Sequence, residues 1–278
     1  MNAINVSGNA ILIYGFHCGT EGVAIPTLVS RFVAAFIIIK LLLKDKWSLH
    51  LERTFRFNPD WSMIRKILSV GIPNGLENSM FQLGKVLVLS LVSTFGTYAI
   101  AANAVSNVIT LFSILPGQAI CLAVTTVIAR CVGAGDYEQA KYYNKKLILL
   151  THIGMAITIF IVFITLPFIL KVYNLSEAAS EATRHIIWFH GFCAILIWAE
   201  SFTLPATFRA CGDAKACMII STVSMWIFRV GASYILGKNL GLGVFGVWVA
   251  MIIDWAFRSL LFGIRYFSGK WKKHALVS

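Results

Sequence analysis

The sequence predicts an all-α, polytopic membrane protein of about eight transmembrane helices. Three observations support this fold class. First, 58% of the 278 residues are hydrophobic and only 13% are charged, which lies outside the range of soluble globular domains. Second, apolar runs recur near the length of about 20 residues that crosses a hydrocarbon core. Third, the basic residues gather in alternate connections. The predicted spans are residues 2–17, 20–43, 67–95, 98–131, 142–173, 185–210, 215–238 and 243–267.

The net charge of +12 is explained by its placement along the chain. Lysine and arginine crowd residues 44–66, the ends of the fourth and sixth spans and the tail, whereas the intervening connections hold few. This is the positive-inside pattern of helices that alternate in direction. It predicts a multi-pass protein of the cell (plasma) membrane with a cytoplasmic C-terminus, and it predicts no binding of nucleic acid.

The first two predicted spans differ from the rest in their surroundings. Residues 2–17 make the weakest span, because the run is short and opens with polar residues, and no basic residue precedes Arg31. A secretory signal would need a positive n-region, so we expect the chain to start inside a longer arrangement of helices. Residues 44–66 form one long polar connection, in which Asn58, Pro59 and Asp60 indicate a turn and a helix N-cap.

Short loops separate the later spans. The sequences GAGD at 133–136 and CGD at 211–213 each place a glycine where a helix can end left-handed, and then an aspartate that can cap the next helix. Neither loop has the spacing of a phosphate-binding loop. The six cysteines lie in or beside apolar runs and the six histidines are scattered, so we expect structural roles for both sets and no metal site.

Polar residues form stripes along several apolar spans. The first stripe lies in GIPNGLENSMFQLGK, residues 71–85, and comprises Asn74, Asn78, Phe81 and Lys85 with Glu77 and Gln82 on its flanks. The others comprise Asn103, Ser106, Asn107 and Thr110; Glu200, Thr203 and Thr207; and Thr222, Trp226, Arg229 and Ser233. Unpaired polar groups are costly in lipid, so these stripes are expected to face one another or water. Helix breaks are predicted at Pro73 and Pro116.

Two interpretations of the stripes remain open. Asparagine and hydroxyl groups serve as interhelical hydrogen-bond partners in many bundles. Carboxylates inside a membrane more often mark an ion or proton path, which favours a functional role for Glu77 and Glu200. For Asp254 the two interpretations are balanced, because Arg258 one turn later would neutralise it. The predicted cation- and substrate-binding residues are Glu77, Glu200, Asn74, Asn78, Lys85, Asn103, Asn107 and Asp254.

Four stretches resemble the multidrug and toxic compound extrusion (MATE) transporters. They are GIPNGLENSMFQLGK, ARCVGAGDYEQAK at 129–141, LPATFRACGDAK at 204–215 and GVWVAMIIDWAFRSLLF at 246–262. The resemblance implies two six-helix lobes around a cleft and export of cationic, lipophilic compounds in exchange for Na⁺ or H⁺. It further implies that 1–43 are the last two helices of the N-terminal lobe, 44–66 a cytoplasmic linker, 67–268 the C-terminal lobe and 269–278 a basic tail.

The same resemblance suggests roles for individual residues. Glu77 and Glu200 match the first and fourth helices of the C-terminal lobe, which often carry acids in this family, and would bind the coupling ion or the substrate cation. The asparagines would supply polar contacts and Lys85 a movable counterion. The family's first four helices, with an aspartate that many members use for coupling, have no counterpart here. The implied partners are the lipid bilayer, small organic cations and those missing helices.

Alternatives to this function remain. A lipid-linked sugar flippase of the same superfamily would have a more cationic cavity, with which Lys85 and Arg229 agree. A truncated, non-functional membrane protein or scaffold would tolerate loss of both glutamates. No nucleophile or metal cluster predicts an enzyme, and no cofactor is expected beyond the coupling ion, Na⁺ or H⁺.

Overall fold

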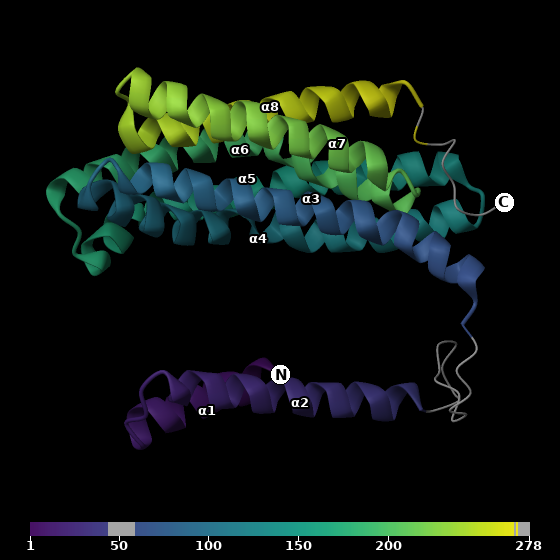
Figure 1. Cartoon of the computed structure of the whole chain (residues 1–278), viewed down its shortest axis with the longest axis horizontal. Helices are drawn as coiled ribbons and strands as arrows, with labels where there is room; N and C mark the ends of the chain where they lie inside the picture. Colours follow the sequence, from purple (N-terminus) through teal and green to yellow (C-terminus); the bar gives the residue numbers. More distant parts are fainter. Residues whose placement is uncertain (44–58, 270, 272–278) are drawn as a thin grey trace. The chain divides into compact units, whose positions relative to one another are not determined.

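The computed structural model describes residues 1–43, 59–269 and 271. The chain divides into two compact units, Met1–Pro59 and Asp60–Ser278, and the boundary lies inside the predicted linker. Helices make up both units and no strand occurs among the described residues (Figure 1). The predicted all-α class is therefore confirmed, while the assignment of the units to lobes stays a prediction.

The first unit is a pair of helical segments. Helix α1 (Asn2–Ala10) continues as the π-helix η1 (Ile11–Gly15), and α2 (Glu21–Leu42) packs against α1. Asn5 donates a hydrogen bond from Nδ2 to Thr27 Oγ1 at 2.9 Å, which joins the two segments through polar groups. Most side chains of α2 are apolar and exposed, as expected of a helix that contacts lipid.

The second unit is a bundle of long helices (Figure 1). In chain order it contains α3 (Trp61–Ser93), α4 (Thr97–Gly133), α5 (Tyr137–Tyr173), α6 (Glu177–Ala210), α7 (Ala214–Ser224), the π-helices η2 (Met225–Gly231) and η3 (Tyr234–Asn239), and α8 (Gly243–Phe267). Helix α6 packs against α4, α5 and α8, and α3 packs against α7. The main core therefore forms around α6, where Trp198, Trp248 and Trp255 are buried.

Six helical stretches among the described residues are long and apolar enough to span a membrane. They are α2, α4, α5, α6, the continuous stretch Ala214–Asn239 and α8. The two other predicted spans are also helical. Helix α3 has 33 residues and carries the polar stripe, and the segment from α1 through η1 is short. The order and positions of all predicted helices thus agree with the sequence.

Helix ends follow the predicted turn chemistry at two of three sites. Asp60 caps α3 by accepting bonds from the amides of Ser62 and Met63, and Asp136 caps α5 by accepting from Gln139 at 2.8 Å. Asn58 lies outside the described residues. Gly135 and Gly212 adopt φ values of 76° and 85°, the left-handed conformation that glycine tolerates.

The predicted capping role of Asp213 is wrong. Asp213 precedes α7, but its side chain makes no capping bond to that helix. Its carboxylate instead accepts two bonds from Arg265 at the end of α8, from Nε at 2.6 Å and from Nη2 at 2.9 Å. A two-point bond with a guanidinium is stronger than a cap to a neutral amide, and it fixes the turn between α6 and α7 against α8.

The predicted helix breaks at Pro73 and Pro116 are also wrong. Helix α3 runs without interruption through Pro73, and α4 runs through Pro116. A proline removes one main-chain hydrogen bond. Each of these helices is longer than 30 residues, and its packing in the bundle outweighs that loss. Both helices therefore stay continuous at these prolines.

Candidate functional site: a cationic aromatic cavity

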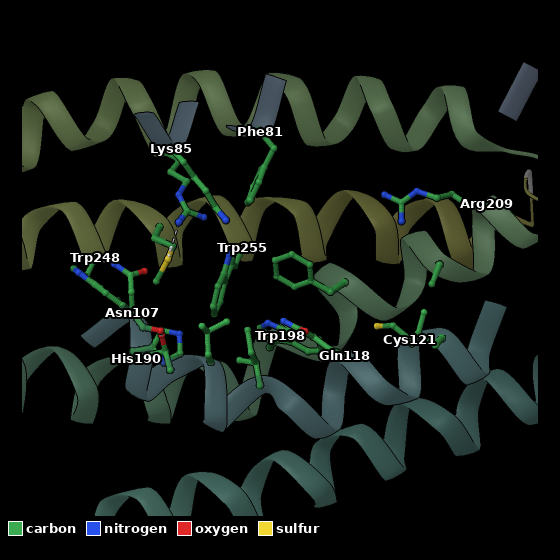
Figure 2. A pocket seen from close by; sticks show the side chains of 18 of the residues that line it. Phe81, Lys85, Asn107, Gln118, Cys121, His190, Trp198, Arg209, Trp248 and Trp255 are labelled. Carbon is green, nitrogen blue, oxygen red and sulfur yellow. Dashed lines mark hydrogen bonds between the residues drawn. The ribbon is translucent and has the colours of Figure 1, made fainter. Parts of the chain in front are cut away.

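The bundle of residues 60–278 contains a cavity of about 590 Å³. Its walls come from α3, α4, α6, η2 and α8, so that residues more than 100 positions apart share one space (Figure 2). The aromatic part of the lining comprises Phe81, Trp198, Phe202, Trp248 and Trp255. A cavity of this size, mostly apolar with a few polar groups, is typical of sites for small molecules.

Close packing between α4 and α6 fixes one aromatic wall of the cavity. Gly117 on α4 lies against the Trp198 indole, and a Cβ added at Gly117 would overlap that ring. Trp198 stacks on Phe202 with centroids 4.9 Å apart, and Phe202 meets Trp255 edge-on at 5.5 Å. The absence of a side chain at Gly117 therefore allows Trp198, and with it the rings of Phe202 and Trp255, to pack close to α4.

The charged groups that line the cavity are all basic. Lys85, Arg209 and Arg229 belong to the lining, and none of the described lining residues is a carboxylate. Lys85 Nζ lies 5.0 Å and Arg229 Cζ 5.3 Å from the centre of the Phe81 ring, so one aromatic ring attracts two cations. The polar face predicted for Phe81 and Lys85 does point into a cavity, and Arg229 joins it from η2.

Glu77 is held by an ion pair with Arg209. Arg209 Nη2 donates to both carboxylate oxygens of Glu77 at 2.8 Å, and the Glu77 side chain is only 8% exposed. The pair joins α3 to the end of α6. The Glu77 carboxylate is therefore neutralised beside the cavity and is not part of its lining.

Glu200 forms a second pair, half-buried, with His152 of α5. His152 Nε2 lies 2.9 Å from Glu200 Oε1, and His152 Nδ1 lies 2.7 Å from the carbonyl oxygen of Ile195. A carbonyl oxygen only accepts, so Nδ1 must donate to it. The short contact on the other ring nitrogen then requires a proton between Nε2 and Oε1, carried either as an imidazolium or as a carboxylic acid. The other oxygen, Oε2, is buried without a hydrogen-bond partner.

Asp254 does not form the predicted ion pair with Arg258. Ser224 donates to Asp254 Oδ1 at 2.5 Å, while Arg258 donates to Ser221 at 3.0 Å and lies over the Phe202 ring. Within the part of the chain that the structure describes, no salt bridge joins the two groups directly. Both side chains are directed at serines of α7, so the helix α7–α8 contact takes the place of the one-turn pair.

The four predicted asparagines fall into two groups. Asn107 lines the cavity and donates to the main-chain oxygen of Asn103, whose side chain accepts a bond from the Trp248 indole at 3.1 Å. Asn74 and Asn78 are linked to each other, through a bond from the Asn78 amide to the Asn74 carbonyl. These two are not among the lining residues.

Two contributors to the site were not identified from the sequence. Arg209 is one of the basic residues at the end of the sixth predicted span, which the positive-inside pattern already explains, although it lies within the stretch LPATFRACGDAK that carries the family resemblance. His152 was grouped with histidines of structural role, yet it is a polar residue in a strongly apolar helix, opposite an equally isolated Glu200. Among the described residues no group of three or more histidine, cysteine, aspartate or glutamate side chains is suited to a metal ion.

Together these features define a multi-pass helical membrane protein whose bundle encloses a charged aromatic cavity. Such a protein lies in a lipid bilayer. The MatE family model matches residues 73–235, which is more than half of the chain, and the chain belongs to this family of transporters.

Known relatives agree with this assignment. The chain is 27% identical over its whole length to a probable multidrug resistance protein NorM of Thermotoga maritima, and 25% identical over 99% of its length to a probable multidrug resistance protein YoeA of Bacillus subtilis. It covers 60% of each. A multidrug resistance MATE family transporter of the MOP superfamily, solved in an outward-facing conformation, shares the fold with a TM-score of 0.87 at 20% identity, over 98% of this chain and 61% of that one. The chain thus spans about three fifths of its relatives' length.

Proposed function

We propose that the chain forms the C-terminal part of a secondary active multidrug efflux transporter of the plasma membrane. The family and the names of the relatives support efflux, and the cavity supplies a place for cargo. Because the chain covers about 60% of those relatives, the rest of a two-lobe cleft would come from helices equivalent to their remaining part. Residues 1–43 would belong to the N-terminal lobe and residues 67–268 to the C-terminal lobe.

The proposed coupling ion is the proton, and the single observation that carries this choice is the His152–Glu200 contact. Its hydrogen-bond pattern needs a proton in the pair, as the carbonyl of Ile195 fixes the donor on the other ring nitrogen. Loss of that proton would leave one N–H of His152 for two acceptors, the Ile195 carbonyl and the Glu200 carboxylate, so that one of the two contacts with α6 would open. Binding and release of one proton would thereby change the contact between α5 and α6, which is what an antiporter needs for coupling.

The sequence-based prediction that Glu77 and Glu200 bind an organic cation has weaker support. Each carboxylate already has a basic partner, Arg209 or His152. A cationic drug would have to compete with that partner. In this proposal Glu77 keeps α3 and α6 together, and Glu200 carries the coupling proton.

The test is proton-coupled transport in proteoliposomes made with the longest reading frame that contains this chain. Pyranine trapped inside reports proton movement when a mixed panel of cationic and anionic fluorescent drugs is added. We expect wild type to exchange protons for at least one drug, and Glu200→Gln and His152→Asn to lose that exchange. The matched control is Glu181→Gln, an exposed carboxylate on the same helix, which should exchange protons like wild type.

Two outcomes would contradict the proposal. Drug movement that follows a Na⁺ gradient at constant pH, with no pyranine response, would reject the proton as the coupling ion. Unchanged proton exchange in folded Glu200→Gln would reject the His152–Glu200 pair as the coupling site.

A lipid-linked sugar flippase remains the second candidate function. It is favoured by one specific observation, the basic lining formed by Lys85, Arg209 and Arg229, which suits a pyrophosphate. Drug exchange in the same proteoliposomes would argue against it.

A further inference from the structure

We propose that the cavity binds organic anions, meaning amphipathic molecules with a flat apolar body and a carboxylate, sulfonate or phosphate head. This inference rests on the proposed transport function, because it names the class of cargo for that site. It reverses the charge of the cargo predicted from the sequence, and it follows from which charges in the cavity are neutralised and which are not.

Among the described residues, Arg209 alone of the three basic lining residues forms a salt bridge with a carboxylate. Arg209 is paired with Glu77. Figure 2 places Arg209 at one end of the cavity, next to Cys121, and Lys85, Asn107 and Trp248 toward the other end. The neutral end of the cavity and the cationic end are therefore separate.

The cationic end holds a guanidinium with few acceptors. Arg229 donates from Nη2 to the sulfur of Met251 at 3.1 Å, and a thioether is a weak acceptor for a group with five N–H donors. Asp254 is the carboxylate that interacts electrostatically with Arg229, but it interacts with Arg258 as well. Two carboxylates, Asp254 and Glu77, thus act on the three arginines Arg209, Arg229 and Arg258. Positive charge therefore remains beside Lys85.

The space around these cations matches an anionic head. A second cavity of about 220 Å³ shares Lys85, Asn107, Arg229, Trp248 and Met251 with the larger one. An anion there would accept bonds from the guanidinium and the ammonium group, and a planar carboxylate or phosphate fits the guanidinium fork. The apolar body would then lie in the larger cavity along Trp198, Phe202 and Trp255.

The same lining disfavours a cationic cargo. Two of the lining rings that could attract a cation already contact basic groups of the chain, since Lys85 and Arg229 lie over Phe81 and Arg258 lies over Phe202. A positively charged ligand would be placed next to two like charges in a partly desolvated space, where such repulsion is poorly screened.

A binding experiment on the chain itself tests this inference. The chain, in lipid nanodiscs, is titrated with pyrenebutyrate and with pyrenebutyl-trimethylammonium, which share one aromatic body and differ in charge. Energy transfer from the tryptophans of the cavity wall to pyrene reports occupancy. We expect the anion to bind at least about tenfold more tightly than the cation, the change that one lost charge-assisted contact causes.

Variants locate the site. Arg229→Met should weaken pyrenebutyrate binding by about tenfold or more. Lys85→Met should do the same, and because the Lys85 side chain is exposed, this variant distinguishes loss of the site from misfolding. The control is Lys238→Met, an exposed lysine of η3 outside both cavities, and it should bind like wild type. Equal or tighter binding of the ammonium probe, or unchanged pyrenebutyrate affinity in both cavity variants, would overturn the inference.

Competition identifies the source of the anion. Naphthalene-2-sulfonate stands for free organic anions and farnesyl pyrophosphate for lipid-linked pyrophosphates, and displacement of pyrenebutyrate by either one supports the site and says which source it prefers. Displacement by neither would overturn it. Because this assay needs no transport, a wrong charge preference leaves the proton-coupling result intact, and a failed proton exchange leaves the binding result intact.

Discussion

The buried Glu77–Arg209 pair gives the sharpest prediction about stability. Replacing Arg209 by glutamine leaves the Glu77 carboxylate, 8% exposed, without the donor that now contacts both of its oxygens at 2.8 Å. Opposite charges about 4 Å apart attract by about 4 kcal/mol at an effective dielectric constant of about 20. Removing one partner of a buried pair costs about 3–5 kcal/mol, so we expect a loss near about 4 kcal/mol for Arg209→Gln.

The reverse change should cost less, because the two side chains differ in exposure. The Arg209 side chain is 26% exposed, so in Glu77→Gln the remaining guanidinium still reaches water, and we expect a loss of about 2 kcal/mol. The double variant removes both charges and should lose only about 1–2 kcal/mol, because two amides can share a hydrogen bond. The coupling energy between the two positions is then about 4–5 kcal/mol.

The assay is reversible unfolding of the chain from mild detergent by SDS, followed by tryptophan fluorescence. Arg130→Gln is the matched control, since Arg130 is an exposed arginine in the last turn of α4, and its free energy of unfolding should stay within about 0.5 kcal/mol of wild type. Additive effects of the two single changes would refute the reasoning, because they would mean that the charges do not stabilise one another.

Three further predictions concern packing, chemistry and the turn at the end of α6. Gly117→Ala should displace the Trp198 indole and lower pyrene energy transfer in the binding assay, whereas retained transfer would mean that α4 and α6 separate without affecting the wall. The Cys211 thiol is 1% exposed; its burial, together with the charge of Asp213, raises its pKa to about 12. It should therefore stay protonated and resist maleimide at pH 8 in the folded chain, becoming labelled only after unfolding, as mass spectrometry would show. Arg265→Gln should destabilise the chain by about 2–4 kcal/mol through the unpaired, 4%-exposed Asp213, while a smaller loss in SDS unfolding would show that water reaches the carboxylate.

How much could be predicted from the sequence depends on the range of each interaction. Apolar runs and helix caps are local, and the helices lie where these signals predicted them, with Asp60 and Asp136 as caps. Partners of buried charges are not local. Glu77 and Arg209 are 132 positions apart. Helical spacing can suggest only partners on the same helix, so it could not suggest Arg209 for Glu77.

The local rule also failed where it seemed strongest. Asp254 and Arg258 have the spacing of an ion pair on one helix, but both are buried in the contact with α7. There Asp254 bonds to the hydroxyl of Ser224, and Arg258 bonds to the hydroxyl of Ser221. Spacing predicts pairs on exposed helix surfaces. In a buried interface the neighbouring helix offers competing partners, and only the packing decides among them.

The arrangement of charge suggests how one bundle could keep the proposed proton site apart from the proposed cargo site. Glu77 and Glu200 lie outside the cavity lining, each with its own basic partner, while Lys85 and Arg229 face the cavity. If Glu200 lined the cavity, an anionic cargo would be repelled whenever the proton left. The proposed proton site in the contact between α5 and α6 would avoid this conflict. Helix α6 also carries Trp198 and Phe202 of the cavity wall, so the two sites would still be connected. Proton release at His152–Glu200 would then act on the cargo through movement of α6. Gly117→Ala keeps the charges but displaces Trp198 of the cavity wall, so it should weaken the exchange of protons for drug more than it weakens proton binding.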